Sequence, residues 1–341
     1  MLNETPRKKR IRILKNDYCQ HYIDTGEYPQ NFVRDHDPEH RFAEYPRLAR
    51  LLQLKNEVIR ARAHPTQSVP ADLRSFDWRK LPCKFDAIIV DPPWAEYEKR
   101  AIALPCREDL SSWTFEELAA LPIPSIAESP SFCFLWAGTE HLDDARRLFA
   151  AWGFRRCEDV VWVKSNVRKA HLAREMNRRA DEEELALQPL VSQDSVLVRT
   201  KEHCLVGVRG SVRRSSDTHI IHANLDTDVI VDEIPNEPGS TAKPMELYDI
   251  VERFCLGRRR LELFGRETNL RPGWLTIGKE VPHNFNAERY ASWFLETPGP
   301  QATCFPFVRD HRGGVFLGTT PEIETLRPRS PPRTPRPEAV G

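Results

Sequence analysis

Phe85-Asp-Ala-Ile-Ile-Val-Asp-Pro-Pro-Trp94 is the stretch that decides the fold of this chain. Its apolar run contains three successive β-branched residues, which predicts a buried strand. The strand must end at the two prolines, because proline cannot donate a hydrogen bond to a sheet ladder. A carboxylate, two rigid backbone carbonyls and an indole therefore follow the carboxyl end of a strand. Open α/β sheets bind their ligands at that edge.

The residues Asp91, Pro92, Pro93 and Trp94 suit the amino group of a flat base. Asp91 and the Pro92 carbonyl can accept hydrogen bonds from such an amine, and Trp94 can stack on the ring, as in enzymes that modify an unstacked base. The alternative is an ordinary turn, since Asp and Pro are common turn formers. The position directly after a strand favours a site, so all four are candidate catalytic residues.

Strand-like and helix-like segments alternate along the rest of the chain. We expect a helix from Pro46 to about Arg62, a short helix opened by the capping box of Thr114 and Glu117, one that ends near Trp152, and one over 245–255. Strands are expected at 85–90, 131–136, 159–163, 203–208, 228–231, 260–264 and 274–277. This alternation predicts an α/β layered fold with a largely parallel sheet.

The composition divides the chain into five expected segments. They are a disordered basic arm at 1–16, a helical extension at 17–66, the main domain at 67–296, a loop insertion at 297–320 and a Pro/Arg-rich tail at 321–341. Within the main domain, residues 168–195 are highly charged and are expected to form a mobile helical insertion. The basic arm fits a nuclear-import signal, a phosphate-binding tail or a solvated terminus. Ser330-Pro and Thr334-Pro leave phosphorylation of the tail open.

Composition also excludes several classes of protein. The 341 residues are 40% hydrophobic, enough for a substantial core, and their net charge of zero does not mark a nucleic-acid binder. The eight cysteines include no Cys-x-x-Cys pair, which argues against structural zinc and a disulfide framework. We expect no membrane span and no signal peptide. Without a G-x-G-x-x-G fingerprint, a nicotinamide cofactor is not expected.

Several longer motifs resemble the mRNA N6-adenosine methyltransferase family, over about Asn16 to Pro332. They are Asn16-Asp-Tyr-Cys-Gln-His-Tyr-Ile-Asp-Thr-Gly, Arg199-Thr-Lys-Glu-His-Cys-Leu, His222-Ala-Asn-Leu-Asp, Phe254-Cys-Leu-Gly-Arg-Arg-Arg, Arg271-Pro-Gly-Trp-Leu-Thr and Asn284-Phe-Asn-Ala-Glu. The resemblance implies a Rossmann-like, S-adenosylmethionine-dependent methyltransferase fold over 67–296. It also implies a nuclear heterodimer with a catalytic homologue, acting on mRNA.

Within that family the motifs resemble the RNA-binding partner subunit more closely than the catalytic subunit. The partner subunit usually carries Glu-Pro-Pro-Leu, whereas this chain has the catalytic form, Asp-Pro-Pro-Trp, at 91–94. The chain therefore combines a body of the partner type with a motif of the catalytic type.

The resemblance also implies the contacts of the cofactor. Asp72 should lie near its adenine, Lys243 should reach its carboxylate, and Arg266 and Asn269 should contact the ribose region. All four residues are present in this chain, so they are the candidate cofactor-binding residues.

Other positions of that pocket differ from the family. Thr268 replaces a histidine, Lys279 and Glu280 replace an Asn-Gln pair, and the loop at 107–112 lacks a tyrosine. Each buried polar contact to a ligand is worth about 1–3 kcal/mol. The loss of two or three therefore predicts a much weaker affinity for S-adenosylmethionine.

Arg213 and Arg214 resemble a basic segment that lies at the RNA groove of the partner subunit. Such residues would contact phosphates without reading the sequence, although a solvated loop is the simpler alternative. Two roles remain open: an RNA-binding platform for a catalytic partner, or an adenine-N6 methyltransferase in its own right. DNA adenine is an alternative substrate to RNA.

Overall fold

The computed structural model describes Phe42 and residues 45–98, 111–165, 196–197, 199–214, 216–233, 240–295 and 316–328. The predicted basic arm at 1–16, the charged stretch at 168–195 and most of the predicted loop at 297–320 lie outside the described residues. Ser330 and Thr334 lie outside them as well.

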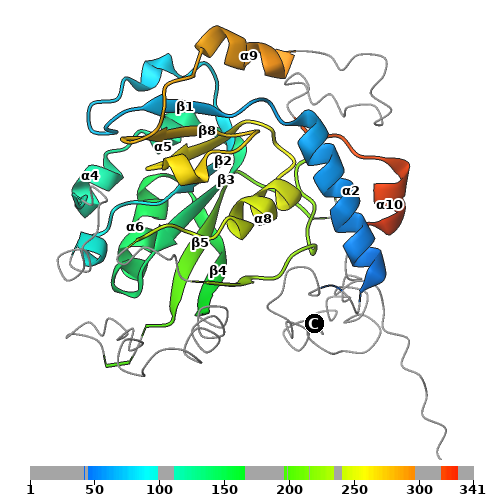
Figure 1. The fold of residues 1–341 in the computed structure, drawn as a ribbon, viewed down its shortest axis with the longest axis horizontal. Helices are drawn as coiled ribbons and strands as arrows, with labels where there is room; N and C mark the ends of the chain where they lie inside the picture. The colour runs from blue at the N-terminus through cyan, green and yellow to red at the C-terminus, as the bar shows by residue number, and fades with distance from the viewer. Residues whose placement is uncertain are drawn as a thin grey trace, which may run out of the picture.

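One mixed sheet organises the described part of the chain (Figure 1). Its strand order is β1-β8-β7-β2-β3-β5-β4-β6, and every neighbouring pair is parallel except the two pairs that involve β5. The prediction of a largely parallel sheet is therefore confirmed. The strands are β1 (Gln67–Pro70), β2 (Phe85–Val90), β3 (Ala127–Ala137), β4 (Arg155–Ser165), β5 (Lys201–Arg209), β6 (Val229–Glu233), β7 (Arg260–Leu263) and β8 (Leu275–Gly278).

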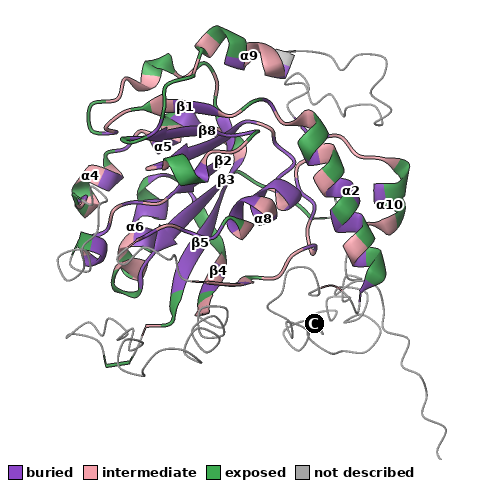
Figure 2. Cartoon of the chain, viewed as in Figure 1, coloured by how far each residue is buried: buried purple, intermediate pink, exposed green. Residues whose placement is uncertain are grey.

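Helices cover both faces of this sheet (Figure 2). The strands β2, β5, β7 and β8 are largely buried, whereas β4 and β6 at one side of the sheet are mostly half-buried or exposed. The helices are α2 (Pro46–Arg62), α4 (Phe115–Ala119), α5 (Ile123–Ile126), α6 (Leu142–Ala151), α8 (Glu246–Phe254), α9 (Ala287–Leu295) and α10 (Pro321–Leu326). On β2, Ile88 and Val90 belong to the same core cluster as residues of α4, α5, α6 and α9. Ala87 and Ile89 belong instead to the cluster that contains α8. Because both faces are buried, the apolar run of β2 is continuous rather than alternating.

The short helix α4 begins where its capping box predicts. The Thr114 side chain accepts a hydrogen bond from the Glu117 backbone N–H, and the Glu117 carboxylate accepts one from the Thr114 N–H. Both bonds satisfy backbone donors that have no partner inside the helix.

The helix α2 has the bounds that the periodicity predicts, and it packs on a segment that the sequence assigned to a tail. Helix α10 lies beside α2 at the flank of the sheet (Figure 1). Ile323 of α10 is 3% exposed and shares a core cluster with the apolar side of α2. The predicted Pro/Arg-rich tail therefore begins with a folded helix, whose first turn is capped by the Thr320 hydroxyl.

The connections place a topological switch beside β2. The chain continues from β2 into β3 on one side, and it returns later to place β7 on the other side. Since ligands of open α/β sheets bind outside the carboxyl ends of the strands at such a switch, Asp91 stands at the expected position. No helix in the described segments is long and apolar enough to cross a membrane.

Candidate active site

A cavity of about 320 Å³ opens at the carboxyl ends of four strands, and we call it the carboxyl-edge cavity. Its walls include 71–73 after β1, 91–93 after β2, 264–268 after β7 and 278–280 at the end of β8. The backbones of Gly265 and Gly278 approach so closely that a Cβ on Gly278 would lie 1.9 Å from the Gly265 carbonyl oxygen. The volume is at the small end of the range of about 300–1,000 Å³ for small-molecule sites.

Asp91 lies in the wall of this cavity and is held by a cation. Its Oδ1 lies 3.0 Å from the Lys243 Nζ, and its side chain is 10% exposed. Burial raises the pKa of the Asp91 carboxyl, while the nearby charges of Lys243 and Arg266 oppose that rise. Asp91 is therefore a buried carboxyl group with an ion-pair partner.

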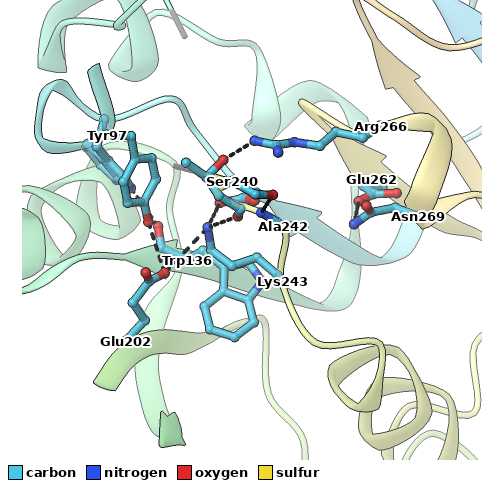
Figure 3. Close-up of polar contacts among 12 residues, drawn as sticks. Tyr97, Trp136, Glu202, Ser240, Ala242, Lys243, Glu262, Arg266 and Asn269 are labelled. Carbon is cyan, nitrogen blue, oxygen red and sulfur yellow. Dashed lines mark hydrogen bonds and ion pairs between the residues drawn. The ribbon is translucent and has the colours of Figure 1, made fainter. Parts of the chain in front are cut away.

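The Lys243 ammonium is surrounded by protein groups, as Figure 3 shows. It donates a hydrogen bond of 2.8 Å to the Thr241 carbonyl and lies 3.4 Å from the Glu202 Oε2. It also lies 4.5 Å from the centroid of the Tyr97 ring, a cation–π distance. The Lys243 side chain is only 2% exposed, and Lys243 does not belong to the lining of the carboxyl-edge cavity.

Glu202 joins this group and was assigned no role by the sequence analysis. Its Oε1 lies 2.5 Å from the Lys164 Nζ, and its Oε2 accepts a hydrogen bond of 3.3 Å from the Tyr97 hydroxyl. Asp91, Glu202, Lys164 and Lys243 thus form a cluster of two carboxylates and two ammonium groups. Glu202 occurs in the Arg199-Thr-Lys-Glu motif, and that motif was the available signal for it.

Trp94 does not face the cavity. Its indole is 1% exposed, its Nε1 donates 2.8 Å to the Trp136 carbonyl, and its ring stacks on His141 at 4.7 Å. In this structure Trp94 is therefore not placed to stack on a base in the carboxyl-edge cavity. Pro92 and Pro93 do line the cavity. The Pro92 carbonyl already accepts a hydrogen bond of 2.9 Å from the Trp94 N–H.

Other aromatic rings line the cavity in place of Trp94. Tyr97, Trp113 and Phe264 all contribute to its wall. Trp113 packs edge-on against Phe264 at 4.9 Å, and the Arg74 guanidinium lies 4.3 Å from the centroid of the Trp113 ring. These three aromatic residues gave no sequence signal for a site, because they come from the segments that follow two different strands.

Asp72 lies at the mouth of the cavity, beside one of the positions that differ from the family. Lys279 lies 3.6 Å from the Asp72 Oδ2 and donates a hydrogen bond of 3.1 Å to the Ser111 hydroxyl. The Asp72 Oδ1 also accepts a hydrogen bond of 2.9 Å from the Arg74 backbone N–H. Lys279 therefore connects the end of β8 with two segments across the cavity.

Arg266 and Asn269 are separated by the structure. Arg266 lines the cavity and donates a hydrogen bond to the Thr241 hydroxyl (Figure 3). Asn269 is 6% exposed and lies outside the cavity wall, where its Nδ2 donates to the Tyr248 hydroxyl at 2.7 Å and to the Glu262 Oε1 at 3.1 Å. Burial raises the pKa of Glu262 to about 7, so this network encloses a carboxyl group that titrates near neutrality.

The four residues assigned to S-adenosylmethionine by resemblance do not fit that group in this conformation. Asp72 and Arg266 reach the cavity, whereas Lys243 and Asn269 do not. Each of the four contacts the chain itself: Lys243 pairs with Asp91 and Glu202, Asp72 pairs with Lys279, Arg266 donates to the Thr241 hydroxyl, and Asn269 donates to Tyr248 and Glu262. A ligand carboxylate would have to draw Lys243 away from both Asp91 and Glu202.

Arg213 and Arg214 are exposed and lie far from this site. Val90, next to Asp91, pairs with Leu135 toward the carboxyl end of β3. Arg209, the last residue of the antiparallel β5, pairs with Ser131 toward the amino end of β3. The chain therefore leaves β5 toward Arg213 at the opposite edge of the sheet from Asp91. The structure does not bring the predicted RNA contacts and the predicted catalytic motif together.

Comparison with known proteins agrees with the fold and the motifs. The MT-A70 family model matches residues 85–280, a range that includes β2 to β8 and the strand ends around Asp91. The N(6)-adenosine-methyltransferase non-catalytic subunit METTL14 of Drosophila melanogaster is 43% identical over 321 residues, which are 93% of this chain and 72% of that protein. The METTL14 subunit of Xenopus tropicalis is 44% identical over 93% of this chain and 62% of its own length.

A METTL3 subunit is less similar to the chain. The N(6)-adenosine-methyltransferase subunit METTL3 of Danio rerio is 31% identical over 64% of this chain and 31% of that protein. The chain thus spans less than two thirds of the frog METTL14 protein, and of METTL3 it matches about a third. The Rossmann-like sheet, the Asp-Pro-Pro-Trp turn at its carboxyl edge and these matches show that the chain belongs to the MT-A70 family of S-adenosylmethionine-dependent methyltransferases.

Proposed function

We propose that this chain is the non-catalytic subunit of an N6-adenosine methyltransferase heterodimer, supporting a catalytic homologue and binding RNA. The observation that carries the proposal is the buried contact of 3.0 Å between Lys243 and Asp91. Relatives named as the non-catalytic subunit are 43% and 44% identical to the chain, against 31% for a METTL3 subunit. That difference favours the same role here.

The contacts of Lys243 explain how an intact Asp-Pro-Pro-Trp motif can be silent. An ammonium group has three protons to donate, and three acceptors surround this one: the Thr241 carbonyl, Glu202 and Asp91. Lys243 therefore balances the charge of Asp91 and lies at its Oδ1, on one side of the carboxylate that would face an incoming adenine.

Arg213 and Arg214 support a role in RNA binding. Both are exposed and stand where the chain leaves the sheet at the edge opposite Asp91. Because β2 has six residues at about 3.3 Å each, the two edges are separated by roughly 20 Å. RNA held at this basic edge would be presented to the site of a neighbouring subunit rather than to Asp91. The predicted basic arm at 1–16 fits a nuclear-import signal, which favours a nuclear location.

A second candidate function is adenine-N6 methyl transfer by this chain on RNA or DNA. It is favoured by the intact Asp-Pro-Pro-Trp at the carboxyl edge of the sheet and by the open cavity that Asp91 lines. In that case, S-adenosylmethionine would have to occupy the carboxyl-edge cavity, and Lys243 would have to change its partners.

One experiment separates the two. The heterodimer is reconstituted with the catalytic homologue, and methyl transfer to an adenosine-containing oligonucleotide is measured for Asp91→Asn and for the matching substitution in the partner. We expect less than about a tenfold loss from Asp91→Asn and nearly complete loss from the partner's change. A loss of about a thousandfold from Asp91→Asn alone, or about 4 kcal/mol of barrier, with an unchanged circular dichroism spectrum, would show that this chain is the enzyme.

A further inference from the structure

Two residues of one motif hold the segment that follows the Asp-Pro-Pro-Trp turn. The Arg199 guanidinium donates a hydrogen bond of 3.1 Å to the Glu96 carboxylate, and Glu202 accepts one of 3.3 Å from the Tyr97 hydroxyl. Arg199 and Glu202 are the first and last residues of the Arg199-Thr-Lys-Glu motif, and Glu96 and Tyr97 are consecutive. The motif that leads into β5 therefore binds two neighbouring side chains just after the turn.

The Glu96 carboxylate occupies a place that a glycine leaves open. The Glu96 side chain is 2% exposed, and a Cβ on Gly138 would lie 1.1 Å from the Glu96 Oε1. The φ of Gly138 is −71°, which any residue adopts, so the close approach of Glu96 is what requires a glycine here. A second nitrogen of Arg199 donates 2.7 Å to the exposed Glu140. Arg199 thus joins Glu96 to the segment that follows β3.

The Tyr97 ring stands between Lys243 and the carboxyl-edge cavity. Tyr97 belongs to the cavity wall, whereas Lys243 does not. The centroid of the Tyr97 ring lies 4.5 Å from the Lys243 Nζ, and that of the Trp136 ring lies 5.7 Å from it. Figure 3 shows Tyr97, Trp136 and Glu202 gathered around the ammonium. A ligand in the cavity therefore meets the Tyr97 ring on the way to Lys243.

The anchors of Tyr97 differ in strength. Its hydroxyl bond of 3.3 Å to Glu202 is long, since such bonds are usually about 2.7–2.8 Å. The bond between Arg199 and Glu96 joins two ionised groups, and such bonds are about twice as strong as neutral ones. Because Glu96 precedes Tyr97 directly, fixing the Glu96 side chain also fixes the backbone that carries the ring.

We propose that Arg199 is a positioning residue that, through Glu96, keeps the Tyr97 ring over Lys243. It thereby withholds the ammonium from carboxylate-bearing ligands of the carboxyl-edge cavity and leaves it paired with Asp91. This assignment rests on the proposed function, in which the pairing of Lys243 with Asp91 keeps the motif silent.

The test is chemical labelling of Lys243 in the reconstituted heterodimer. The complex is acetylated with N-hydroxysuccinimidyl acetate, and mass spectrometry gives the rate at Lys243 relative to the exposed Lys80. In the unaltered complex, Lys243 should react much more slowly than Lys80. Arg199→Met should raise the Lys243 rate about tenfold, because the closed arrangement loses a hydrogen bond between charged groups and opens locally more often.

Two further variants separate the position of Glu96 from its charge. Gly138→Ala puts a methyl group where the Glu96 carboxylate lies, so it displaces that carboxylate without any change of charge. It should raise the Lys243 rate as Arg199→Met does. Glu140→Gln is the matched control, because it removes only the exposed partner of Arg199 and should leave the rate unchanged.

A Lys243 rate that stays low in both Arg199→Met and Gly138→Ala would overturn the role of Arg199 and leave the proposed function intact. An equal rise in Glu140→Gln would also overturn it. A Lys243 rate equal to that of Lys80 in the unaltered complex would contradict the enclosure of Lys243, and the proposed function with it. If Arg199→Met fails to assemble, Gly138→Ala decides: a raised rate supports the proposal, and an unchanged rate overturns it.

Discussion

The Lys243 ammonium lies 3.0 Å from the Asp91 carboxylate, in a place where the Lys243 side chain is 2% exposed. This one contact joins the residue expected to hold a cofactor to the residue expected to orient a substrate. Lys243 and Asp91 are therefore paired with each other in this structure. The motif of a catalytic subunit and the body of a partner subunit can therefore coexist in one chain.

Replacement of Lys243 should destabilise the fold, and a second replacement should restore it. Lys243→Met leaves Asp91 and Glu202 buried with one cation fewer, and breaking a buried pair costs about 3–5 kcal/mol. Lys243→Met with Asp91→Asn should recover much of this loss, because the uncompensated charge is removed. Urea denaturation midpoints at fixed protein concentration measure both. Equal losses in the single and double variants would contradict the ion pair.

Cofactor binding should have a stoichiometry of one per heterodimer. The carboxyl-edge cavity offers S-adenosylmethionine neither a free Lys243 nor Asn269, so we expect only the catalytic partner to bind it. Isothermal titration calorimetry of the reconstituted complex gives the number of sites directly. Two sites of similar affinity would refute this prediction and would favour the second candidate function.

Arg214 should support RNA binding through phosphates. Arg214→Glu should weaken the affinity for many sequences alike and reduce the slope of log affinity against log salt concentration, because phosphate contacts release counterions. Fluorescence anisotropy at several salt concentrations measures both quantities, with Arg79→Glu as a control at another exposed arginine. If the affinity and the slope are unchanged, the RNA lies elsewhere.

The chain should form an obligate heterodimer. Its body resembles subunits that act in a complex, and obligate partners bury large apolar interfaces. Alone it should be poorly soluble or self-associated, and the catalytic homologue should convert it to a single heterodimeric species in light scattering. A stable monomer that ignores the homologue would count against the proposed function.

Lys55 should make stability depend on pH in a defined direction. Burial and the charge of Arg327 lower the pKa of Lys55 to about 7 in the folded state, against about 10.5 unfolded. Between these values the unfolded chain holds one more proton, so stability should rise with pH from about 7 upward. Below pH 7 both states are protonated, and the cost of the buried charge is fully present.

Lys55→Met should flatten that rise, and the difference between variant and unaltered chain isolates Lys55 from other groups. The groups that face it are His222, Arg327, Arg253, Asp226 and Glu324. Thermal denaturation of the complex at several pH values measures these slopes.

Local patterns predicted most of the sheet. The run over 85–90 became β2 with the same bounds, because a continuous apolar stretch ended by prolines has few other solutions. The predicted α2 also has the observed bounds. By contrast, β1 (Gln67–Pro70) was missed, because four residues with a terminal proline carry no periodicity and become a strand only by pairing with β8.

The helix at the start of the tail has a recognisable sequence signal, but the composition of the tail suggested disorder. Thr320 followed by Pro321 is a recognisable start of a helix, yet the Pro/Arg-rich residues after it suggested a disordered tail. Helix α10 has only six residues and is held by packing of Ile323 against α2, at the other end of the sequence. Such a short helix is not stable by itself.

The sequence by itself determined the strand, the turn and the edge of the sheet at which Asp91 stands, because these depend on neighbours along the chain. Only the tertiary structure decided what each side chain meets there. Trp94 turns toward the Trp136 carbonyl, Lys243 toward Asp91, and Lys55 toward His222, all from distant segments. The physical reason is that burial obliges each polar group to find a partner, and which partner lies within reach is set by the packing of the whole domain.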